Sequence, residues 1–300
     1  MRLVNYQIGQ AKGRLGAVVG DVIVDLARIA EVEGTVLPDN MLAFIQGGKQ
    51  MQALAHGLLG KSEGNWPAGV TVPAASAKLL APFRPNKIIG IGLNYVEHVE
   101  ESSRTLDTSK ELPTRPVLFA KASTAVIGPD DAIHHNANLT NQVDWESELA
   151  VVMARDAKGV SEAEALLYVF GYSIMNDISA RDQRRSGLWF FSKGQDTYAP
   201  FGPYVVTADE IPDPHALDIK LRVNGVTKQD SNTKYMLFKV PTLIADITSG
   251  VTLEAGDVIA TGTPSGVGAG RVPQEFLQPG DVVEAEVEQL GILRNHVVAV

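Results

Sequence analysis

The sequence predicts an α+β fold built around an antiparallel or mixed β-sheet. Strand-like segments dominate, and the regular strand–helix alternation of parallel α/β proteins is missing. Glycine-containing turns separate many of these segments, as hairpin connections do. The chain has 300 residues, of which 45% are hydrophobic and 20% are charged, so it can bury a sizeable core in one large or two smaller domains.

The first part of the chain is predicted to form a small N-terminal α+β domain. Segments 2–7 and 14–26 are rich in strand-forming residues, and Gly20-Asp21 marks a tight turn within the second segment. Residues 40–59 then favour a helix that is interrupted at a Gly-Gly pair.

A Pro- and Ala-rich connector, residues 66–77, follows this helix and marks a domain boundary. The predicted domains are therefore a small N-terminal domain, residues 1–80, and a larger domain, residues 81–300. The larger domain begins with a strand at 87–91. Further strand-like segments lie at 116–121, 146–153, 171–179, 203–208 and 218–229.

Turn and helix signals complete the larger domain. Asn224-Gly225 is a strong hairpin signal. Residues 240–250 favour a helix that ends at its final glycine, and glycine turns divide segments 256–268 and 280–300 into strands. The polar segment 100–116 has no clear periodicity, which predicts a long loop that could act as a lid.

The composition excludes several classes of protein. The absence of cysteine rules out disulfides, thiolate nucleophiles and zinc–thiolate sites. The start of the chain lacks a signal peptide and no window is apolar enough to span a bilayer, so we expect a cytoplasmic protein with no membrane partner. A net charge of −9 argues against nucleic acid as a partner but allows a small anionic substrate.

Common catalytic motifs are incomplete or missing. GIGLNY has a tyrosine where a dinucleotide loop needs its third glycine, and GTPSGVGAG lacks the Gly-Lys-Ser/Thr ending of a phosphate loop. The sequence contains neither a Gly-x-Ser-x-Gly elbow nor a His-Glu-x-x-His pair. Serine-hydrolase and zinc-protease chemistry therefore have no support.

Three acidic residues, Asp144, Glu146 and Glu148, alternate along the segment VDWESELAVVM. In a strand, alternation would place the carboxylates on one face, where like charges repel. A solvated edge strand could carry such a pattern. The same face continues with Ala150 and Val152, however, so the acids stand at an apolar border and need a counter-charge. A hard cation such as Mg²⁺ would supply one.

Four further polar residues are candidates for a site. Asp177 interrupts an apolar strand and offers another acid, or else caps the following turn. His98 and Glu101 are three residues apart, so on a helical turn the carboxylate can orient the imidazole as a base, whereas an exposed pair would only be a solvated face. Lys193 follows an aromatic run, and a surface lysine is its simplest interpretation.

Five segments together resemble the fumarylacetoacetate hydrolase family. They are GLNYVEHVEE, ESELAVVM, NDISARD, FSKGQDTYAPFGP and TGTPSGVG, in the order seen in that family. The resemblance covers about residues 85–300, and many members carry a small N-terminal domain. It implies a mixed β-sheet roll, usually as a homodimer, with a Mg²⁺ or Mn²⁺ site. The implied ligands are Glu146, Glu148 and Asp177, whereas Asp144 has no such role in the family.

The resemblance also implies roles for other residues. His98 and Glu101 match a water-activating dyad, and Lys193 matches a substrate-facing lysine. Thr263 lies in the glycine-rich loop that lines the pocket. Two further residues, Arg181 and Gln183, match the segment that contacts the carboxylate end of the substrate. The polar segment 100–115 matches the lid, and Ser265 stands where some members have lysine.

These observations predict a metal-dependent hydrolase that cleaves a C–C bond in an acylpyruvate-like or other 2,4-dioxo acid. His98, held by Glu101, would activate the attacking water, and Lys193 would stabilise the developing oxyanion. Decarboxylation, isomerisation, or hydration on the same metal site is the alternative, because fold and metal do not choose among them. A more remote alternative is a non-catalytic binding protein stabilised by metal.

Overall fold

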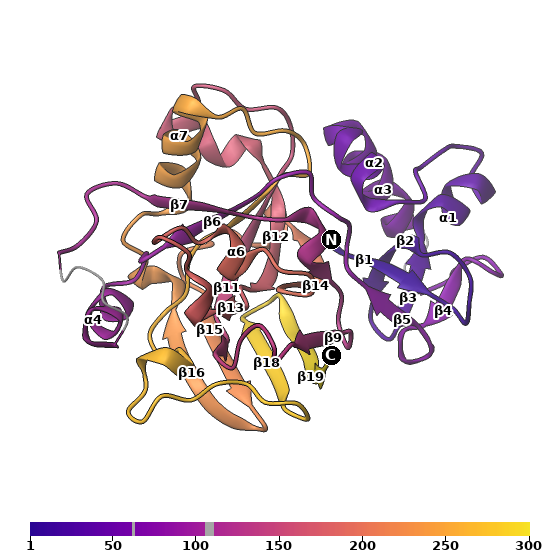
Figure 1. Ribbon diagram of the computed structural model, residues 1–300. Helices are drawn as coiled ribbons and strands as arrows, with labels where there is room; N and C mark the ends of the chain where they lie inside the picture. Colours follow the sequence, from indigo (N-terminus) through magenta and orange to yellow (C-terminus); the bar gives the residue numbers. More distant parts are fainter. Residues whose placement is uncertain (62–63, 106–110) are drawn as a thin grey trace.

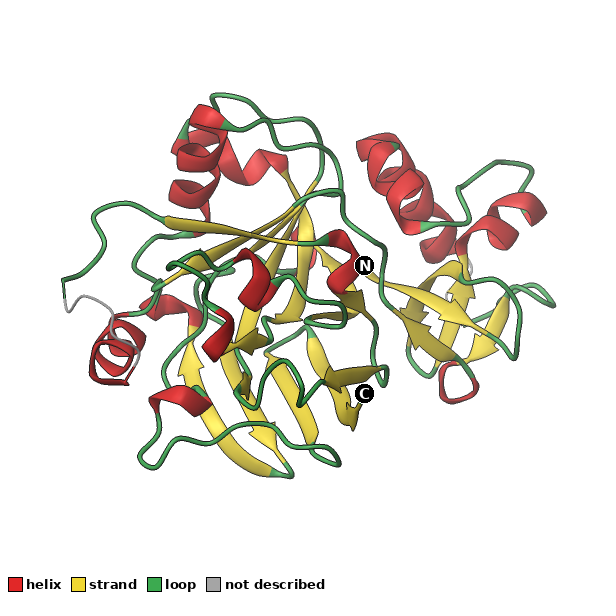
Figure 2. Cartoon of the chain, viewed as in Figure 1, coloured by secondary structure: helices red, strands yellow, loops and turns green. Residues whose placement is uncertain are grey.

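Two β-sheets that pack face to face form the larger part of the molecule (Figures 1 and 2). The computed structural model describes residues 1–61, 64–105 and 111–300. The longer sheet contains β1 (Arg2–Gln7), β2 (Arg14–Val19), β3 (Val22–Asp25), β4 (Thr71–Pro73), β5 (Lys78–Leu80), β6 (Ile88–Gly92), β7 (Val117–Lys121), β8 (Val126–Ile127), β11 (Ser147–Met153), β12 (Val169–Asn176), β14 (Ala199–Thr207) and β17 (Val258–Ala260).

The second sheet contains β9 (Ala132–His135), β15 (Asp218–Val223), β16 (Val226–Asn232), β18 (Val282–Val287) and β19 (Gly291–Ala299). Two short strands, β10 (Val143–Asp144) and β13 (Ser179–Ala180), pair with each other. The α-helices are α1 (Leu26–Val32), α2 (Met41–Gln46), α3 (Gly48–Lys61), α4 (Val96–Thr105), α5 (Glu162–Ala165), α6 (Phe190–Lys193) and α7 (Val240–Gly250). Short 3₁₀ helices are η1 (Ala74–Ser76), η2 (Ser123–Ala125), η3 (Leu166–Tyr168), η4 (Arg181–Gln183), η5 (Ala208–Glu210), η6 (Thr233–Tyr235) and η7 (Gly268–Gly270).

The longer sheet is mixed. Its strand order is β4-β3-β2-β1-β14-β12-β11-β17-β6-β7, with β5 paired to β1 and β8 to β14. Most neighbours are antiparallel, but β17 runs parallel to β6. The second sheet has the order β16-β15-β18-β19-β9, and its last pair is also parallel. This arrangement confirms the predicted α+β class with a mixed sheet.

Strand β11 lies in the interior of the longer sheet, between β12 and β17. Leu149 and Val151 belong to the apolar cluster beneath the second sheet, whereas Ala150 and Val152 belong to the cluster on the other face. A strand buried on both faces is expected to be a continuous apolar run, as this one is. The solvated-edge interpretation of its acidic start is therefore wrong.

The N-terminal unit extends the longer sheet sideways, as Figure 1 shows for the indigo part of the chain. β1 pairs antiparallel with β14, so that Leu3 stands opposite Val205. The apolar core is continuous across this junction, because Phe44 of α2 meets Phe170 of β12 edge-on, with ring centroids 6.2 Å apart. The division into residues 1–80 and 81–300 stays a prediction.

The predicted turns and two of the helices are confirmed. Asn224 and Gly225 connect β15 to β16, with φ angles of 51° and 76°. The helix expected at 40–59 is divided into α2 and α3 at the glycine pair, where Gly48 has a φ of 61°. Helix α7 spans the predicted residues 240–250. Helix α1 was not predicted; Asp25 ends β3 and caps this helix by accepting from Arg28 N.

The segment predicted as a loop over 100–116 begins as helix. Residues 100–105 belong to α4, so that part of the prediction is wrong. Residues 106–110 lie outside the described residues, and 111–116 contain no regular element. The polar composition concealed the helix because α4 has apolar residues only near its start, at Val96 and Val99.

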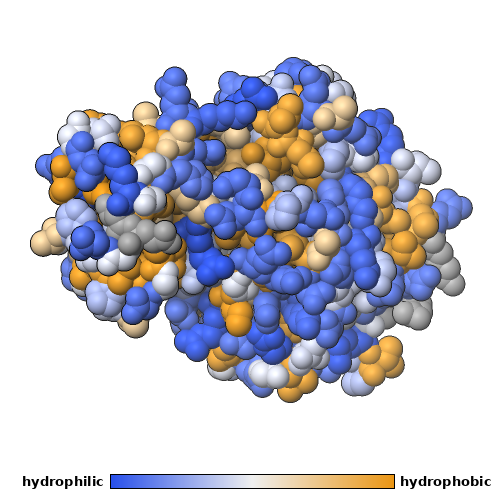
Figure 3. Space-filling view, turned by 180° about the vertical axis from the view of Figure 1, so that it is seen from behind, coloured by the Kyte–Doolittle hydropathy of each residue, from blue (hydrophilic) through white to orange (hydrophobic). Residues whose placement is uncertain are grey.

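The face opposite to that of Figure 1 carries many polar side chains (Figure 3). Seen from behind, hydrophilic side chains cover much of the molecule, with smaller apolar areas between them (Figure 3). Within the described ranges, no helix combines the length and apolar character that crossing a membrane requires.

Candidate active site

Glu146, Glu148 and Asp177 converge at one end of the β11–β12 pair. Ser147 of β11 stands opposite Asn176 of β12, so the residues flanking this pair meet in space. Asp177 N donates to the carbonyl of Glu146 at 2.8 Å. One carboxylate oxygen from each acid lies within 4.8 Å of the others, and all three side chains are buried. The geometry thus brings together the three acids that the family resemblance implied as ligands.

The backbone that carries the acids differs from the one expected from the sequence. The acids were expected along one continuous strand, but β10 ends at Asp144 and β11 begins at Ser147. Glu146 lies in the break, where its own N–H donates to Asn176 Oδ1 at 3.0 Å. The irregular backbone, rather than strand alternation, aims Glu146 toward Glu148.

Three buried cations surround the acids. Lys193 Nζ donates to Glu146 Oε2 at 2.8 Å and to Asp177 Oδ2 at 2.6 Å. Lys121, at the end of β7, donates from Nζ to Asp177 Oδ1 and to the Lys193 carbonyl. Arg181 Nη2 forms an ion pair with Glu146 Oε1 at 2.6 Å. Because Lys193 is only 5% exposed, its interpretation as a surface lysine is wrong.

The unequal surroundings of Glu146 and Glu148 separate the pKa values of these two carboxyl groups. Burial would raise the pKa of Glu146, but the charges of Lys193 and Arg181 outweigh it and hold that pKa low. Burial, reinforced by the charges of Asp177 and Glu146, raises the pKa of Glu148 well above its usual value. Glu148 accepts a hydrogen bond from Gly262 N at 3.0 Å. A carboxylate with a raised pKa gains most from a nearby divalent cation, which can replace its proton.

The donor set fits a hard divalent cation. Three carboxylates provide only oxygen ligands, the type that Mg²⁺ and Mn²⁺ prefer. Their oxygens are close enough to share one ion, and their mutual repulsion would be relieved by it. Lys193 already bridges two of the three, so an ion would share these carboxylates with the ammonium group.

His98 and Glu101 lie on α4, with His98 Nδ1 3.4 Å from Glu101 Oε2. Ser102 Oγ is 3.5 Å from the other ring nitrogen, Nε2. Gly266 N donates to both carboxylate oxygens of Glu101, at 3.0 and 3.1 Å. His98 is 5% exposed and Glu101 is 8% exposed, so the alternative of a solvated pair is wrong. The carboxylate is held by the loop and can in turn orient the imidazole.

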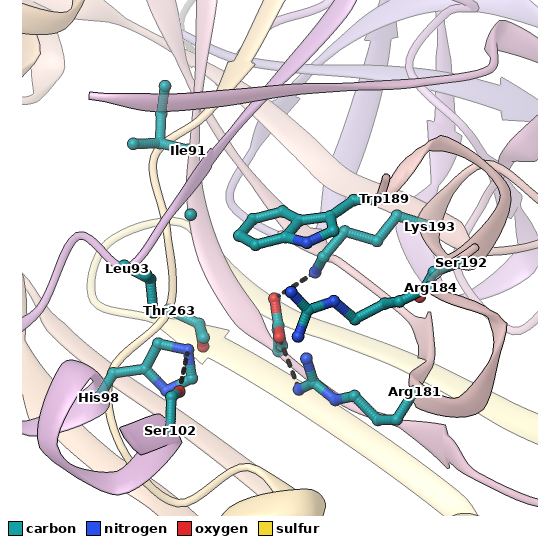
Figure 4. Close-up of a pocket in the computed structure, with 12 residues that line it drawn as sticks. Ile91, Leu93, His98, Ser102, Arg181, Arg184, Trp189, Ser192, Lys193 and Thr263 are labelled. Atoms are coloured by element: carbon teal, nitrogen blue, oxygen red, sulfur yellow. Dashed lines mark hydrogen bonds and ion pairs between the residues drawn. The ribbon is translucent and has the colours of Figure 1, made fainter. Parts of the chain in front are cut away.

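A narrow cavity lies between His98 of the dyad and Glu146 of the triad. Its volume is about 30 Å³, so only a few water molecules fit in this conformation. In Figure 4, Arg181, Arg184 and Lys193 reach into it from one side, and His98 and Ser102 face them. The residues that line it are Ile91, Gly92, Leu93, His98, Ser102, Glu146, Arg181, Arg184, Trp189, Ser192, Lys193 and Thr263.

The two remaining predicted site residues differ in their position: Thr263 lines the cavity and Gln183 does not. Thr263 lines the cavity, but its hydroxyl donates to the Ser147 carbonyl at 2.9 Å and accepts from Gln229 at 2.7 Å. Gln183 is not among the lining residues, and its amide donates to the Leu139 carbonyl at 2.7 Å. Substrate contact by either residue stays a prediction.

Sequence reasoning missed several residues at this site. Lys121 is 4% exposed, although its position at the end of a strand gave no sign of burial. Trp189 covers Gly92 so closely that a Cβ there would lie 2.2 Å from the indole ring. Arg184 stacks over the same indole, 5.2 Å from the centroid. The aromatic run before Lys193 was the one available signal, because aromatic and Arg side chains often line ligand pockets.

Comparison with known proteins decides the family. The family model for the C-terminal domain of fumarylacetoacetate hydrolase matches residues 87–298. The chain belongs to the fumarylacetoacetate hydrolase family. The resemblance drawn from the five sequence segments is thereby confirmed.

Individual members of the fumarylacetoacetate hydrolase family match over the full chain. A mitochondrial oxaloacetate tautomerase of Rattus norvegicus is 38% identical over 304 residues, which is 99% of this chain and 92% of that protein. The structure of a fumarylacetoacetate hydrolase from the psychrophile Exiguobacterium antarcticum has a TM-score of 0.82 and 34% identity, and the match covers 100% of both chains.

A third relative bears on the metal. The structure of maleylpyruvate hydrolase from Sphingobium sp. SYK-6 in complex with manganese(II) and pyruvate has a TM-score of 0.79 and 30% identity, covering 100% of this chain and 99% of that chain. The family is therefore one of enzymes that act on small oxo acids, and divalent metal occurs in it. The acidic triad of this chain is the corresponding candidate site.

Proposed function

We propose that this protein is a metal-dependent enzyme that interconverts the keto and enol forms of a small dicarboxylic 2-oxo acid, with oxaloacetate as the first candidate. The observation that carries the proposal is the narrow cavity that Glu146 helps to line and in which His98 faces Arg181 and Lys193 (Figure 4). This cavity offers a base in His98, one acid of the triad in Glu146, and the cations Arg181, Arg184 and Lys193. The full-length similarity to a tautomerase of that oxo acid favours this reaction over others of the family.

Charge balance supports an anionic substrate. The three triad carboxylates carry three negative charges and a divalent cation supplies two positive ones, so a dianionic substrate needs further cations. Arg181 and Lys193 line the cavity and can bind carboxylate oxygens. Glu146, Glu148 and Asp177 would hold Mg²⁺ or Mn²⁺, which when bound supplies Lewis-acid polarisation of a substrate oxygen.

His98 performs the proton transfer in this account. Glu101 lies at Nδ1 and accepts a hydrogen bond from it, which puts the lone pair that acts as the base on Nε2, where Ser102 Oγ lies 3.5 Å away. Nε2 removes a proton from the carbon next to the keto group, and the imidazolium that forms then returns a proton to the keto oxygen, which gives the enol and restores neutral His98. The reverse sequence restores the ketone. No atom is gained or lost, and the small cavity limits access of bulk water during the transfer.

Hydrolysis of a C–C bond in a 2,4-dioxo acid is the second candidate. The His98–Glu101 pair favours it, because an imidazole oriented by a carboxylate can also deprotonate water. Lys193 would then stabilise the oxyanion that forms at the attacked carbonyl. The structural similarity to maleylpyruvate hydrolase points in the same direction. Decarboxylase and hydratase activities, and a non-catalytic binding role, lack a comparable observation, and we do not propose them.

One comparison separates the two reactions. The Mn²⁺-loaded protein is mixed with the enol form of oxaloacetate or with an acylpyruvate, and the loss of enol absorbance and the release of pyruvate are followed in parallel. A tautomerase accelerates the loss of oxaloacetate enol without releasing pyruvate. A hydrolase instead releases pyruvate from the acylpyruvate. His56→Gln is the matched control, because His56 lies on α3 and is exposed; it should behave as wild type, whereas His98→Gln should lose the activity.

The remaining parts of the proposal rest on the family resemblance. We propose Mg²⁺ as the native ion and a homodimer as the assembly, which metal analysis and sedimentation equilibrium of the purified protein would test. The cytoplasmic location stays a prediction, and the tautomerase from rat is named as mitochondrial.

A further inference from the structure

We infer that Asp144 is a positioning residue, which fixes Arg181 and the glycine-rich loop so that the guanidinium faces the substrate anion. Asp144 is fully buried and is neither one of the clustered acids nor among the residues that line the cavity. The inference rests on the proposed function only in taking the ligand to be an oxo-acid anion.

The carboxylate of Asp144 is saturated with donors. Oδ1 accepts from Gly268 N at 2.6 Å and from Trp145 N at 2.8 Å. Oδ2 accepts from Ala269 N at 3.0 Å and from Arg181 Nε at 2.8 Å. A carboxylate has about four lone-pair positions, so every one is used. A buried carboxylate with this many donors holds its partners in one arrangement.

Arg181 links Asp144 to the cavity. Its Nε is bound to Asp144, while Nη2 forms the ion pair with Glu146 at 2.6 Å. The planar guanidinium is therefore held at two positions, by Asp144 at the end of β10 and by Glu146 in the break that follows. Figure 4 shows Arg181 pointing toward the space opposite His98. A guanidinium held in this way meets a carboxylate with little loss of side-chain entropy.

The backbone N–H groups of Gly268 and Ala269, which donate to Asp144, connect this aspartate to the His98–Glu101 dyad. Gly268 and Ala269 open η7, and Gly266, two residues earlier, donates to Glu101. Gly268 has no room for a side chain, since a Cβ would lie 2.7 Å from Asp144 Oδ1 and 2.0 Å from the Glu275 carbonyl. Asp144 therefore anchors the loop that holds Glu101, the partner of His98.

Asp144→Asn tests the inference. An amide in place of the carboxylate removes the charge and turns an NH₂ group toward N–H donors, so at least one of Arg181 and the loop loses its acceptor. Mn²⁺ affinity should stay near that of wild type, because the three ligand candidates are unchanged. Oxalate affinity of the Mn²⁺-loaded protein should fall about 10–100-fold, the range of losses for outer partners of site residues. Both affinities are measured by calorimetry.

Asp257→Asn is the matched control. Asp257 is also buried, accepts from Lys87 N at 3.1 Å and Glu254 N at 2.7 Å, and pairs with Lys87 Nζ at 2.9 Å, but no member of this cluster lines the cavity. Thermal unfolding records the stability loss of both variants. A general structural effect would weaken oxalate binding in both. Equal oxalate loss in the two variants, or wild-type oxalate affinity in Asp144→Asn, would overturn the inference.

A double-mutant cycle with Arg181→Met tests whether Asp144 acts through the guanidinium. If it does, Asp144→Asn should weaken oxalate binding much less in the Arg181→Met background than in wild type. Fully additive losses would contradict the proposed route. Oxalate binding requires no turnover, so a failure of the inference about Asp144 can be distinguished from a failure of the proposed function. A protein that converts no oxo acid but loses oxalate affinity in Asp144→Asn refutes the proposed function and leaves the role of Asp144 intact.

Discussion

The ammonium group of Lys193 bridges two acids of the triad and lies 2.6 Å from Asp177 Oδ2. The charges of Asp177 and Glu146 outweigh the effect of burial and raise the pKa of Lys193. The lysine is thus held as a cation in contact with the candidate metal ligands. In the proposed account it would compete with an ion for these oxygens, and it would lie beside the bound ion, where it could contact the substrate.

Replacing Lys193 separates these two effects. Lys193→Met removes the competing charge, so Mn²⁺ affinity should be equal to or higher than that of wild type. Oxalate affinity of the loaded protein should fall, because one of the cations that face the anion is gone. Calorimetry with Mn²⁺ and then oxalate measures both. A large loss of Mn²⁺ affinity would show instead that Lys193 supports the metal site.

The acidic triad should account for metal binding. Glu148→Gln removes one carboxylate charge from the triad, and Mn²⁺ affinity should fall by more than the roughly 10–100-fold that an outer-sphere partner contributes. Asp144→Asn is the control, because it removes a neighbouring buried carboxylate that lies outside the cluster. Unchanged affinity in Glu148→Gln, or an equal loss in the control, would reject this set of ligands.

The dyad should affect turnover and not ligand binding. His98→Ala should lower kcat by about 10²–10⁴-fold, the usual contribution of a positioned base. Mn²⁺ and oxalate affinities should stay near wild type. Glu101→Gln should change kcat in the same direction, and the double variant should be little worse than the worse single one, because the pair acts as a unit. Near wild-type turnover in His98→Ala would remove His98 from the mechanism.

Asp25 should make stability depend on pH. Burial would raise its pKa, but hydrogen bonds from Arg14, Arg28 N and Tyr6 together lower it. A pKa that is lower in the folded state stabilises the fold above the unfolded value of about 3.9 and loses this effect as the pH falls toward the folded value. Asp25→Asn should therefore lower the unfolding free energy at pH 7 by about 1–3 kcal/mol.

Urea unfolding across acid pH tests this prediction. Wild type should lose stability below about pH 4, and Asp25→Asn should show a flatter dependence there. Asp21→Asn is the control, because Asp21 is exposed in the turn between β2 and β3. A wild-type pH profile in Asp25→Asn would show that other carboxyl groups dominate acid unfolding.

Local signals predicted much of the secondary structure, because they depend on neighbouring residues. Asn224-Gly225 specified the β15–β16 turn, and the glycine pair specified the break between α2 and α3. The strand order could not be obtained in this way. The pairing of β1 with β14 and of β17 with β6 joins segments far apart in the sequence, and no local pattern encodes it. The continuous core across residue 80 follows from that pairing.

At the candidate site, too, local patterns in the sequence pointed to some residues and gave no sign of those whose contacts lie far apart along the chain. The alternating acids and the His98–Glu101 spacing drew attention to residues that lie close together in the structure. The family resemblance implied their roles, which stay predictions. Lys121 was missed because its burial depends on Asp177, which lies 56 residues away. Asp144 received no role, since its partners Gly268 and Arg181 meet it only in the folded chain. A residue whose function is to hold other residues has no spacing pattern of its own.

The most direct test of the central claim is an anomalous difference map from crystals soaked with Mn²⁺ and oxalate. The account predicts one strong Mn²⁺ peak coordinated by oxygens of Glu146, Glu148 and Asp177. Oxalate should complete the coordination and contact Lys193 and Arg181, with His98 facing the same cavity. A peak at any other group of residues, or no peak at saturating Mn²⁺, would contradict the account.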